Sequence, residues 1–129
     1  MKDCLHFISP NFIVADLQIS VAFYTEKLGF SIWFIGPDEN PFFAMIKRDN
    51  VSIMLKQIAP DVLPVPNHTR HPYARLDAFV STSEPDELAE EFQSRGVAFH
   101  QPLRNDEDGL RGFEIKDADG YVLFFGRPI

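Results

Sequence analysis

The chain has 129 residues, of which 45% are hydrophobic and 24% charged, the size and composition of one globular domain and too apolar for a disordered chain. Its 12 basic and 19 acidic side chains give a net charge of −7, which repels phosphate backbones and argues against nucleic acid as a partner. No apolar run exceeds five residues, whereas a membrane-spanning helix needs about 20, so we expect no membrane partner.

The N-terminus and the cysteine content indicate the compartment. No apolar core of a signal peptide follows Met1 and Lys2, so we expect a cytoplasmic protein. Cys4 is the only cysteine, which excludes a disulfide within the chain and a Cys-rich zinc site. Aromatic residues make up 13% of the chain, more than a small core requires, so some of them could line a pocket.

The pattern of residues 1–56 predicts one β-α-β-β-β unit. An alternating stretch that ends at Val14 precedes a helix from Leu17 to Leu28, in which apolar residues recur at helical spacing and which Gly29 ends. Three short β-like stretches follow, over 30–35, 42–48 and 51–56.

The segment 57–72 predicts an extended connector. It holds four prolines, Pro60, Pro64, Pro66 and Pro72, and almost no periodicity. It separates two halves that are each too short to bury a large core alone, so we expect them to pack on each other or on another copy.

Residues 73–129 repeat the pattern of the first half. A helix is predicted over 83–95, with Ser83 and Asp86 as its N-terminal cap and Gly96 as its end. Three β-like stretches follow, over 97–100, 110–116 and 121–126. The sequence therefore predicts an α+β fold in which two tandem βαβββ modules, 1–56 and 73–129, form the single domain 1–129.

Strand alternation predicts which side chains point away from the helices. The face so derived mixes apolar, aromatic and charged groups, which is typical of a ligand cleft. The alternative is a face that packs against the other half, with Arg75 and Asp77 as an ordinary ion pair. Glu114 could act as a base in a metal-free reaction, but an isolated carboxylate on a strand is usually solvated. On the strand 30–35 we expect Phe34 on the packing side, and Trp33 with Ile35 on the other side, where Trp33 could stack on a planar ligand or lie in a dimer contact.

The doubled unit and two segments carry a family resemblance. VADLQISVAFYTEKLGF (Val14–Phe30) and FEIKDADGYVLFFG (Phe113–Gly126) are similar to the vicinal oxygen chelate superfamily, which includes glyoxalase I, extradiol dioxygenases and the fosfomycin and bleomycin resistance proteins. The resemblance covers nearly the whole chain. It implies a curled mixed β-sheet with flanking helices around a cleft, often completed by a homodimer.

The resemblance also implies four positions that hold a divalent metal in enzymes of that superfamily. They fall on Ser9, Met54, Arg75 and Phe124. A thioether and a phenyl ring do not hold a hard cation, a serine hydroxyl is a poor ligand, and a guanidinium repels the ion. We therefore expect no metal and no other cofactor. The positions of His6, His68, His71 and His100 do not suggest a displaced site either.

The sequence thus resembles the metal-free, bleomycin-resistance-like branch, a likeness that extends to Pro10 six residues before Asp16. This implies a homodimeric, drug-sequestering protein that holds an amphipathic or aromatic small molecule in an acidic, aromatic-lined cleft, with no catalytic residue. The residues expected to bind this ligand are Asn11, Trp33, Met54, Tyr73, Arg75, Asp77, Phe79 and Phe124.

Two alternatives remain open. One is a lyase, isomerase or oxidoreductase of the glyoxalase or dioxygenase type, with non-standard metal ligands or with Arg75 stabilising an enolate-like charge. The other is a regulatory or structural protein whose mixed face is a protein interface.

Overall fold

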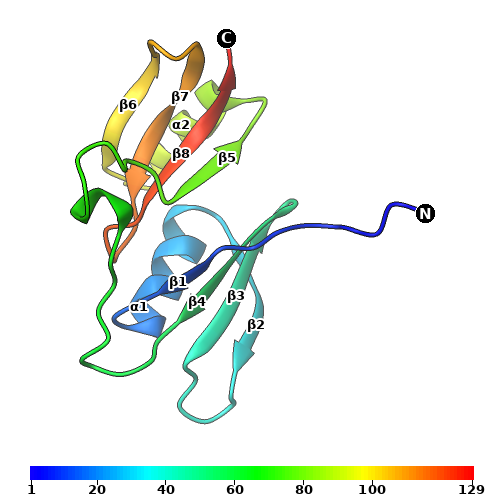
Figure 1. Ribbon diagram of the computed structural model, residues 1–129, viewed down its shortest axis with the longest axis vertical. Helices are drawn as coiled ribbons and strands as arrows, with labels where there is room; N and C mark the ends of the chain where they lie inside the picture. Colours follow the sequence, from blue (N-terminus) through cyan, green and yellow to red (C-terminus); the bar gives the residue numbers. More distant parts are fainter.

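The computed structural model describes all residues from Met1 to Ile129 as two βαβββ modules in tandem (Figure 1). The first module consists of β1 (Asn11–Ile13), α1 (Leu17–Ala22), a π-helical turn (Phe23–Lys27), β2 (Ser31–Gly36), β3 (Phe43–Arg48) and β4 (Val51–Lys56). The second consists of β5 (Ala78–Ser81), α2 (Pro85–Ser94), β6 (Phe99–Asn105), β7 (Leu110–Lys116) and β8 (Val122–Pro128), and a 3-10 turn (Asn67–Thr69) interrupts the connector. The predicted α+β fold is confirmed.

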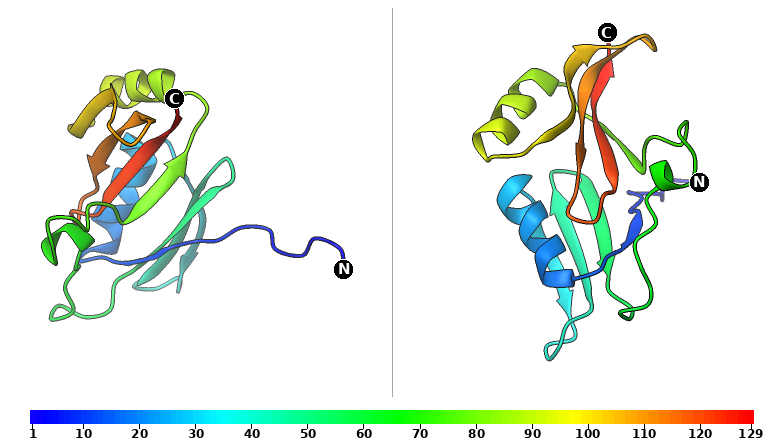
Figure 2. Two further views of the ribbon diagram at one scale, coloured as in Figure 1. Left: turned by 45° about the horizontal axis from the view of Figure 1, so that its top comes forward. Right: turned by 90° about the vertical axis from the view of Figure 1, so that its left-hand side faces the viewer.

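Each module contains one four-stranded mixed sheet. The strand orders are β1-β4-β3-β2 and β5-β8-β7-β6, and in each sheet the first strand pairs parallel with the last while the other pairs are antiparallel. Both helices lie on one side of the two sheets, as the right-hand view of Figure 2 shows. The opposite side, which we call the outer face, is left uncovered by helices. Neither helix is long and apolar enough to cross a membrane.

The predicted helix ends are confirmed, but one predicted cap is wrong. Gly29 and Gly96 follow the two helices with φ of 72° and 81°, the left-handed conformation in which glycine ends a helix at no steric cost. The second helix begins at Pro85, and its N-cap, Glu84, makes no side-chain cap bond. The expected cap by Ser83 is absent because proline, with its fixed φ and no N–H group, suits the first helical position itself.

The two modules share one hydrophobic core. Nineteen buried side chains from both form a single cluster, in which the rings of Phe12 and Tyr121 stack with centroids 4.3 Å apart. The Tyr24 hydroxyl donates to the Asp117 carboxylate at 2.6 Å, and the Tyr121 hydroxyl donates to the carbonyl of Ile13 at 2.6 Å. The turn between β7 and β8 is thereby fixed against the first module.

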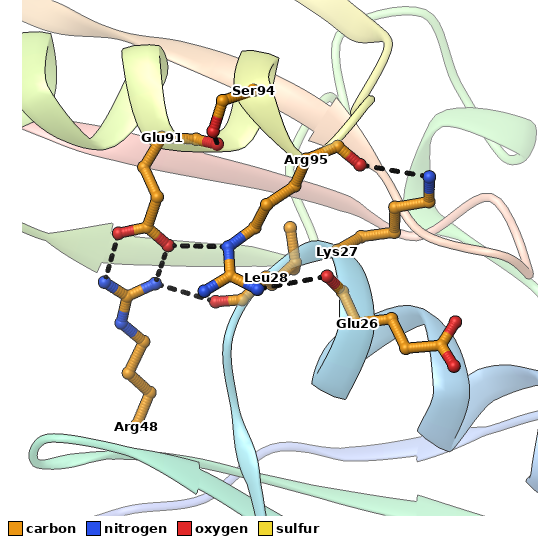
Figure 3. A network of polar contacts seen from close by, with 7 residues as sticks. All are labelled: Glu26, Lys27, Leu28, Arg48, Glu91, Ser94 and Arg95. Atoms are coloured by element: carbon orange, nitrogen blue, oxygen red, sulfur yellow. Dashed lines mark hydrogen bonds and ion pairs between the residues drawn. The ribbon is translucent and has the colours of Figure 1, made fainter.

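A polar network ties the C-terminal ends of both helical segments to the β3–β4 hairpin (Figure 3). Arg48 donates to both carboxylate oxygens of Glu91 at 2.8 Å and to the carbonyl of Leu28 at 2.8 Å. Arg95 donates to Glu91 at 3.0 Å, and Lys27 donates to the carbonyl of Arg95 at 3.1 Å. Cations at helix C-termini also complement the helix dipole, so the network holds the modules together on the helix side.

Strand β2 departs from the expected alternation. A bulge between Ile32 and Phe34 shifts the register, so that Phe34 pairs with Met45 and Ile35 with Ala44. Ile35 consequently packs on the core, whereas Phe34 is 57% exposed. The predicted sides of Phe34 and Ile35 are therefore wrong, since one extra residue in a strand reverses every side chain that follows it.

Burial of Asp117 makes the stability of the contact between modules depend on pH. Desolvation raises the pKa of Asp117 from 3.8 to about 6, although its hydrogen bonds with Tyr24, Asp119 and Tyr121 act in the opposite direction. The folded protein therefore holds this proton more tightly than the unfolded chain does. The stability that this group contributes is fully present below its unfolded pKa and is lost as the pH rises through about 6.

Replacing Asp117 by asparagine should remove this pH-dependent component. Between about pH 4 and about pH 7, we expect the free energy of unfolding of the wild type to fall, relative to that of Asp117→Asn, by up to about 3 kcal/mol. Urea unfolding at a series of pH values measures this difference, with Asp61→Asn in the exposed connector as a control. A difference that stays constant with pH would contradict this assignment.

Candidate functional site

An aromatic row crosses the outer face of the second sheet. Phe79 of β5 is in register with Phe124 of β8, which is in turn in register with Glu114 of β7. The two rings stack with centroids 5.2 Å apart at an interplanar angle of 24°. Phe79 is 51% exposed and Phe124 only 4%. Phe79 is thus an exposed aromatic platform supported by a buried ring.

Two glycines leave the space in which the Phe124 ring lies. Gly112 and Gly126 face each other on β7 and β8. A Cβ atom added to Gly112 would lie 2.5 Å from the Phe124 ring, and one added to Gly126 would lie 2.6 Å from it. Both distances are shorter than real carbon contacts allow, so the position of the ring requires glycine on both strands.

A buried carboxylate ends the aromatic row. Glu114 is 4% exposed and accepts a hydrogen bond from the guanidinium of Arg75, whose side chain is 48% exposed. This hydrogen bond is the main cause that raises the pKa of Arg75. The alternative in which Arg75 pairs with Asp77 is therefore wrong, as is the interpretation of Glu114 as a solvated carboxylate. The sequence signal for Glu114 was its place between the buried Phe113 and Ile115, which puts its side chain on the face of Phe124.

The carboxylate of Asp77, a predicted ligand residue, holds two backbone segments in place. Its two oxygens accept hydrogen bonds from the backbone N–H groups of Asn67 at 2.9 Å and Val122 at 2.8 Å. The residue thereby fastens the connector to the start of β8. Asp77 and Asn11 line the same hollow of about 340 Å³ at the seam between the sheets, together with Tyr121.

A second hollow lies between the chain before β1 and strand β5. This hollow has a volume of about 330 Å³ and includes Pro10, Ser52 and Phe79 in its lining. A further hollow of about 440 Å³ lies on the helix side. Two more hollows, of about 520 Å³ and about 530 Å³, lie against α2 and β6 and beside Gly29 and Trp33. We place the candidate site on the outer face because the stacked pair of Phe79 and Phe124 lies there.

The remaining predicted residues lie at different places on the outer face and its edges. Met54 is half-buried and in register with Asn11. Tyr73 is 89% exposed, with its ring 5.4 Å from that of His71. Trp33 is 50% exposed and contacts Phe7, with ring centroids 5.5 Å apart. The structure thus brings together Phe79 and Phe124, and Arg75 is linked to this pair only through Glu114. Separately, Asn11 lies beside Met54 and lines a hollow with Asp77, while Tyr73 and Trp33 contact other aromatic rings.

The four positions that hold the metal in related enzymes do not fit a divalent cation. The Ser9 hydroxyl is buried without a hydrogen-bond partner, and Arg75 is engaged by Glu114. Met54 and Phe124 offer a thioether and a phenyl ring, which are not donors for a hard ion. Nowhere in the chain do three or more His, Cys, Asp or Glu side chains gather in a way that could hold a metal.

The family is decided by the match of the sequence to a family model. The model is described as the Glyoxalase/Bleomycin resistance protein/Dioxygenase superfamily, and it matches residues 5–125. The chain belongs to this superfamily. The resemblance seen in the sequence is therefore confirmed. No curated protein sequence matches the chain.

Three solved structures share the fold over nearly their whole length. TnmS3, an antibiotic binding protein from Streptomyces sp. CB03234, matches with a TM-score of 0.69 and 22% identity over 98% of this chain and 97% of that one. A glyoxalase-related enzyme from Clostridium phytofermentans matches with a TM-score of 0.75 and 16% identity over 99% and 98% of the two chains. A glyoxylase/bleomycin resistance protein/dioxygenase domain from Frankia sp. EAN1pec gives a TM-score of 0.72 and 23% identity over 100% of both. At these identities the likeness concerns the fold alone.

Substitution of Gly126 tests the support of the aromatic row. In Gly126→Ala the new methyl group meets the Phe124 ring and the carbonyl of Arg111, so we expect a loss of about 1–3 kcal/mol in the free energy of unfolding. Chemical denaturation measures this loss. Ser81→Ala, in register with Gly126 on the neighbouring strand, is the control and should change stability by less than about 0.5 kcal/mol. A Gly126→Ala protein as stable as the wild type would contradict the packing described for Phe124.

Proposed function

We propose that this glyoxalase-superfamily protein binds a planar aromatic or amphipathic small molecule directly on its outer face, without a metal. The observation that carries the proposal is the exposed Phe79 ring stacked on the buried Phe124 ring, on a sheet face that no helix covers. Offset stacking on such a platform contributes about 0.5–1.5 kcal/mol beyond the burial of apolar area.

The surroundings of the platform support the same function. Hollows of about 330 Å³ and 340 Å³ follow the seam beside Phe79 and Asp77, within the size range of small-molecule sites. Their walls combine apolar side chains with a few polar groups, Asn11 and Asp77 among them. Antibiotic binding by TnmS3, a protein of the same fold, makes a drug-like ligand the natural candidate.

We propose in addition that two copies form a cytoplasmic homodimer. Large apolar side chains remain exposed near the free edge of the first sheet, namely Phe7, Ile32, Trp33, Phe34 and Phe42, each at least 49% exposed. Such a group favours contact with a second copy. Light scattering coupled to size-exclusion chromatography should give twice the 14.7 kDa of one chain, and a mass of one chain would contradict the dimer.

The enzymatic alternative receives less support from the same residues. An arginine that stabilises an enolate-like charge needs a free guanidinium, whereas that of Arg75 donates to the Glu114 carboxylate. A metal-dependent reaction needs donors that Ser9, Met54 and Phe124 do not supply.

Elemental analysis separates the binding protein from a metal-dependent enzyme. After dialysis we expect well below one ion of Zn, Ni, Mn or Fe per chain, because the four strand positions lack suitable donors. A stoichiometric metal that survives dialysis would contradict metal-free binding.

Truncation of Phe79 tests the proposed platform. A panel of planar aromatic antibiotics, bleomycin included, is titrated by calorimetry and by thermal unfolding, and at least one should raise the melting temperature. For that compound we expect Phe79→Ala to weaken binding about tenfold, a loss of about 1.4 kcal/mol. Ile19→Ala removes an exposed apolar side chain from α1, on the helix side, and should leave the affinity unchanged. Failure of every compound to bind the wild type would contradict the proposed function, and equal affinities of wild type and Phe79→Ala would contradict the platform.

A further inference from the structure

Phe79 presents the free face of its ring to the seam between the two sheets. The rings of Phe79 and Phe124 stack with centroids 5.2 Å apart, close to the spacing of about 4.8 Å between neighbouring strands. They therefore stack along the direction from one strand to the next. Phe124 lies on β8, and β5 is the edge strand of the second sheet, with β8 as its only neighbour. The face of Phe79 that Phe124 leaves uncovered is thus directed away from the second sheet.

A hollow lies on that side of the ring. It has a volume of about 330 Å³, and its lining includes Phe79 of β5, Ser52 of β4, and His6 and Pro10 of the chain before β1. This volume is at the lower end of the range of small-molecule sites, which suits a ligand of two fused rings. Such a ligand, stacked on the free face of Phe79, lies in the same hollow as Ser52.

The hydroxyl of Ser52 is buried without a hydrogen-bond partner. The residue is 4% exposed, and its side-chain oxygen is one of four in the chain that are buried and make no hydrogen bond. A buried hydroxyl without a partner costs free energy, which a ligand that supplies the partner recovers. Rotation about one bond moves the oxygen among three staggered positions, and a hydroxyl both donates and accepts. Ser52 can therefore turn to a polar group in the hollow.

The internal repeat shows that the fold does not require a hydroxyl at this place. Ser52 is in register with Lys47 in the β3–β4 hairpin, and Val122 is in register with Lys116 at the corresponding place on β8 and β7. Val122 is 1% exposed, so it is buried as deeply as Ser52. An apolar side chain serves the same structural position in the second module, which indicates that the Ser52 hydroxyl has a role other than stability.

The lining of the hollow carries hardly any charge. It contains no aspartate, glutamate, lysine or arginine, and His6 is its only titratable residue. A charged group of a ligand would enter the hollow without a counter-ion, which costs free energy when the group loses its hydration. An uncharged hydroxyl or carbonyl group loses less and gains a hydrogen bond with Ser52. The hollow therefore favours a neutral ligand, although the whole chain has a net charge of −7.

We propose that the ligand is an uncharged planar aromatic molecule of two fused rings with a hydroxyl or carbonyl group, and that Ser52 determines this specificity. The rings stack on Phe79, and the oxygen of the ligand shares a hydrogen bond with the Ser52 hydroxyl. This inference rests on the proposed function and adds to it the charge and the polar group of the ligand.

The test uses three naphthalenes of similar shape. 2-Naphthol carries a hydroxyl, 2-methylnaphthalene carries a methyl group in its place, and 2-naphthylmethylamine is a cation at neutral pH. Their affinities for the full chain are measured at neutral pH by amide NMR titration, in which the shifts of Ser52 and Phe79 locate the site. The wild type should bind 2-naphthol severalfold more tightly than the cation.

Two matched substitutions isolate the hydroxyl. Ser52→Ala should weaken the binding of 2-naphthol about fivefold and change that of 2-methylnaphthalene by less than about twofold. The control is Ser20→Ala, because the hydroxyl of Ser20 is likewise buried without a partner but lies in α1, on the helix side. It should leave all three affinities unchanged. Each variant removes a hydroxyl that makes no hydrogen bond, so both should fold.

The outcomes distinguish this inference from the function on which it rests. Tightest binding of the cation, equal binding of 2-naphthol by wild type and Ser52→Ala, or equal weakening of 2-naphthol and 2-methylnaphthalene would overturn the inference. In each case the aromatic platform stays supported if Phe79→Ala weakens the binding of 2-methylnaphthalene. Binding of no naphthalene by the wild type would also overturn the inference, while the antibiotic panel decides the proposed function separately.

Discussion

The shared core of two short modules is the constraint on which the rest of the structure depends. Each half is too short to bury a large core alone, and both helices and the inner faces of both sheets meet in one cluster of 19 buried side chains. The Arg48–Glu91 network and the Tyr24–Asp117 contact fix this arrangement on two sides. Because both helices lie on the inner side, no helix covers the outer faces of the two sheets.

The side chains on the outer face determine which kind of ligand this face suits. Where related enzymes place metal donors, this chain has a thioether, a phenyl ring, an isolated hydroxyl and a guanidinium that is already engaged. The same strands instead support an exposed ring on a buried ring, with two glycines beneath it. An aromatic surface of this kind contacts organic molecules directly, through stacking and apolar area.

The sequence allowed the architecture to be predicted because hydrophobic periodicity and the repeat are local properties. The helix from Leu17 and its end at Gly29 follow from spacing and backbone conformation alone. Features that depend on tertiary context could not be predicted in this way. The bulge at Trp33 inverted the sides of Phe34 and Ile35, and Pro85 rather than Ser83 determined where the second helix begins.

The candidate site illustrates the same limit. Alternation placed Phe79, Phe124 and Arg75 on one face. The burial of Glu114 depends on neighbours that are distant in sequence, such as Arg75 before β5 and Phe124 on β8, and no local pattern predicts it. The partner of Arg75 was likewise a choice between Asp77, two residues away, and Glu114, 39 residues away. Both oxygens of Asp77 accept hydrogen bonds from backbone N–H groups, one on the connector and one on β8. Asp77 is therefore already satisfied, and Arg75 pairs with Glu114.

A crystal structure of the protein with a planar aromatic compound that raises its melting temperature tests the central claim most directly. The account predicts that the plane of this compound lies against the exposed ring of Phe79 on the outer face. A metal ion held by side chains of the outer face, or a compound bound only on the helix side, would contradict it.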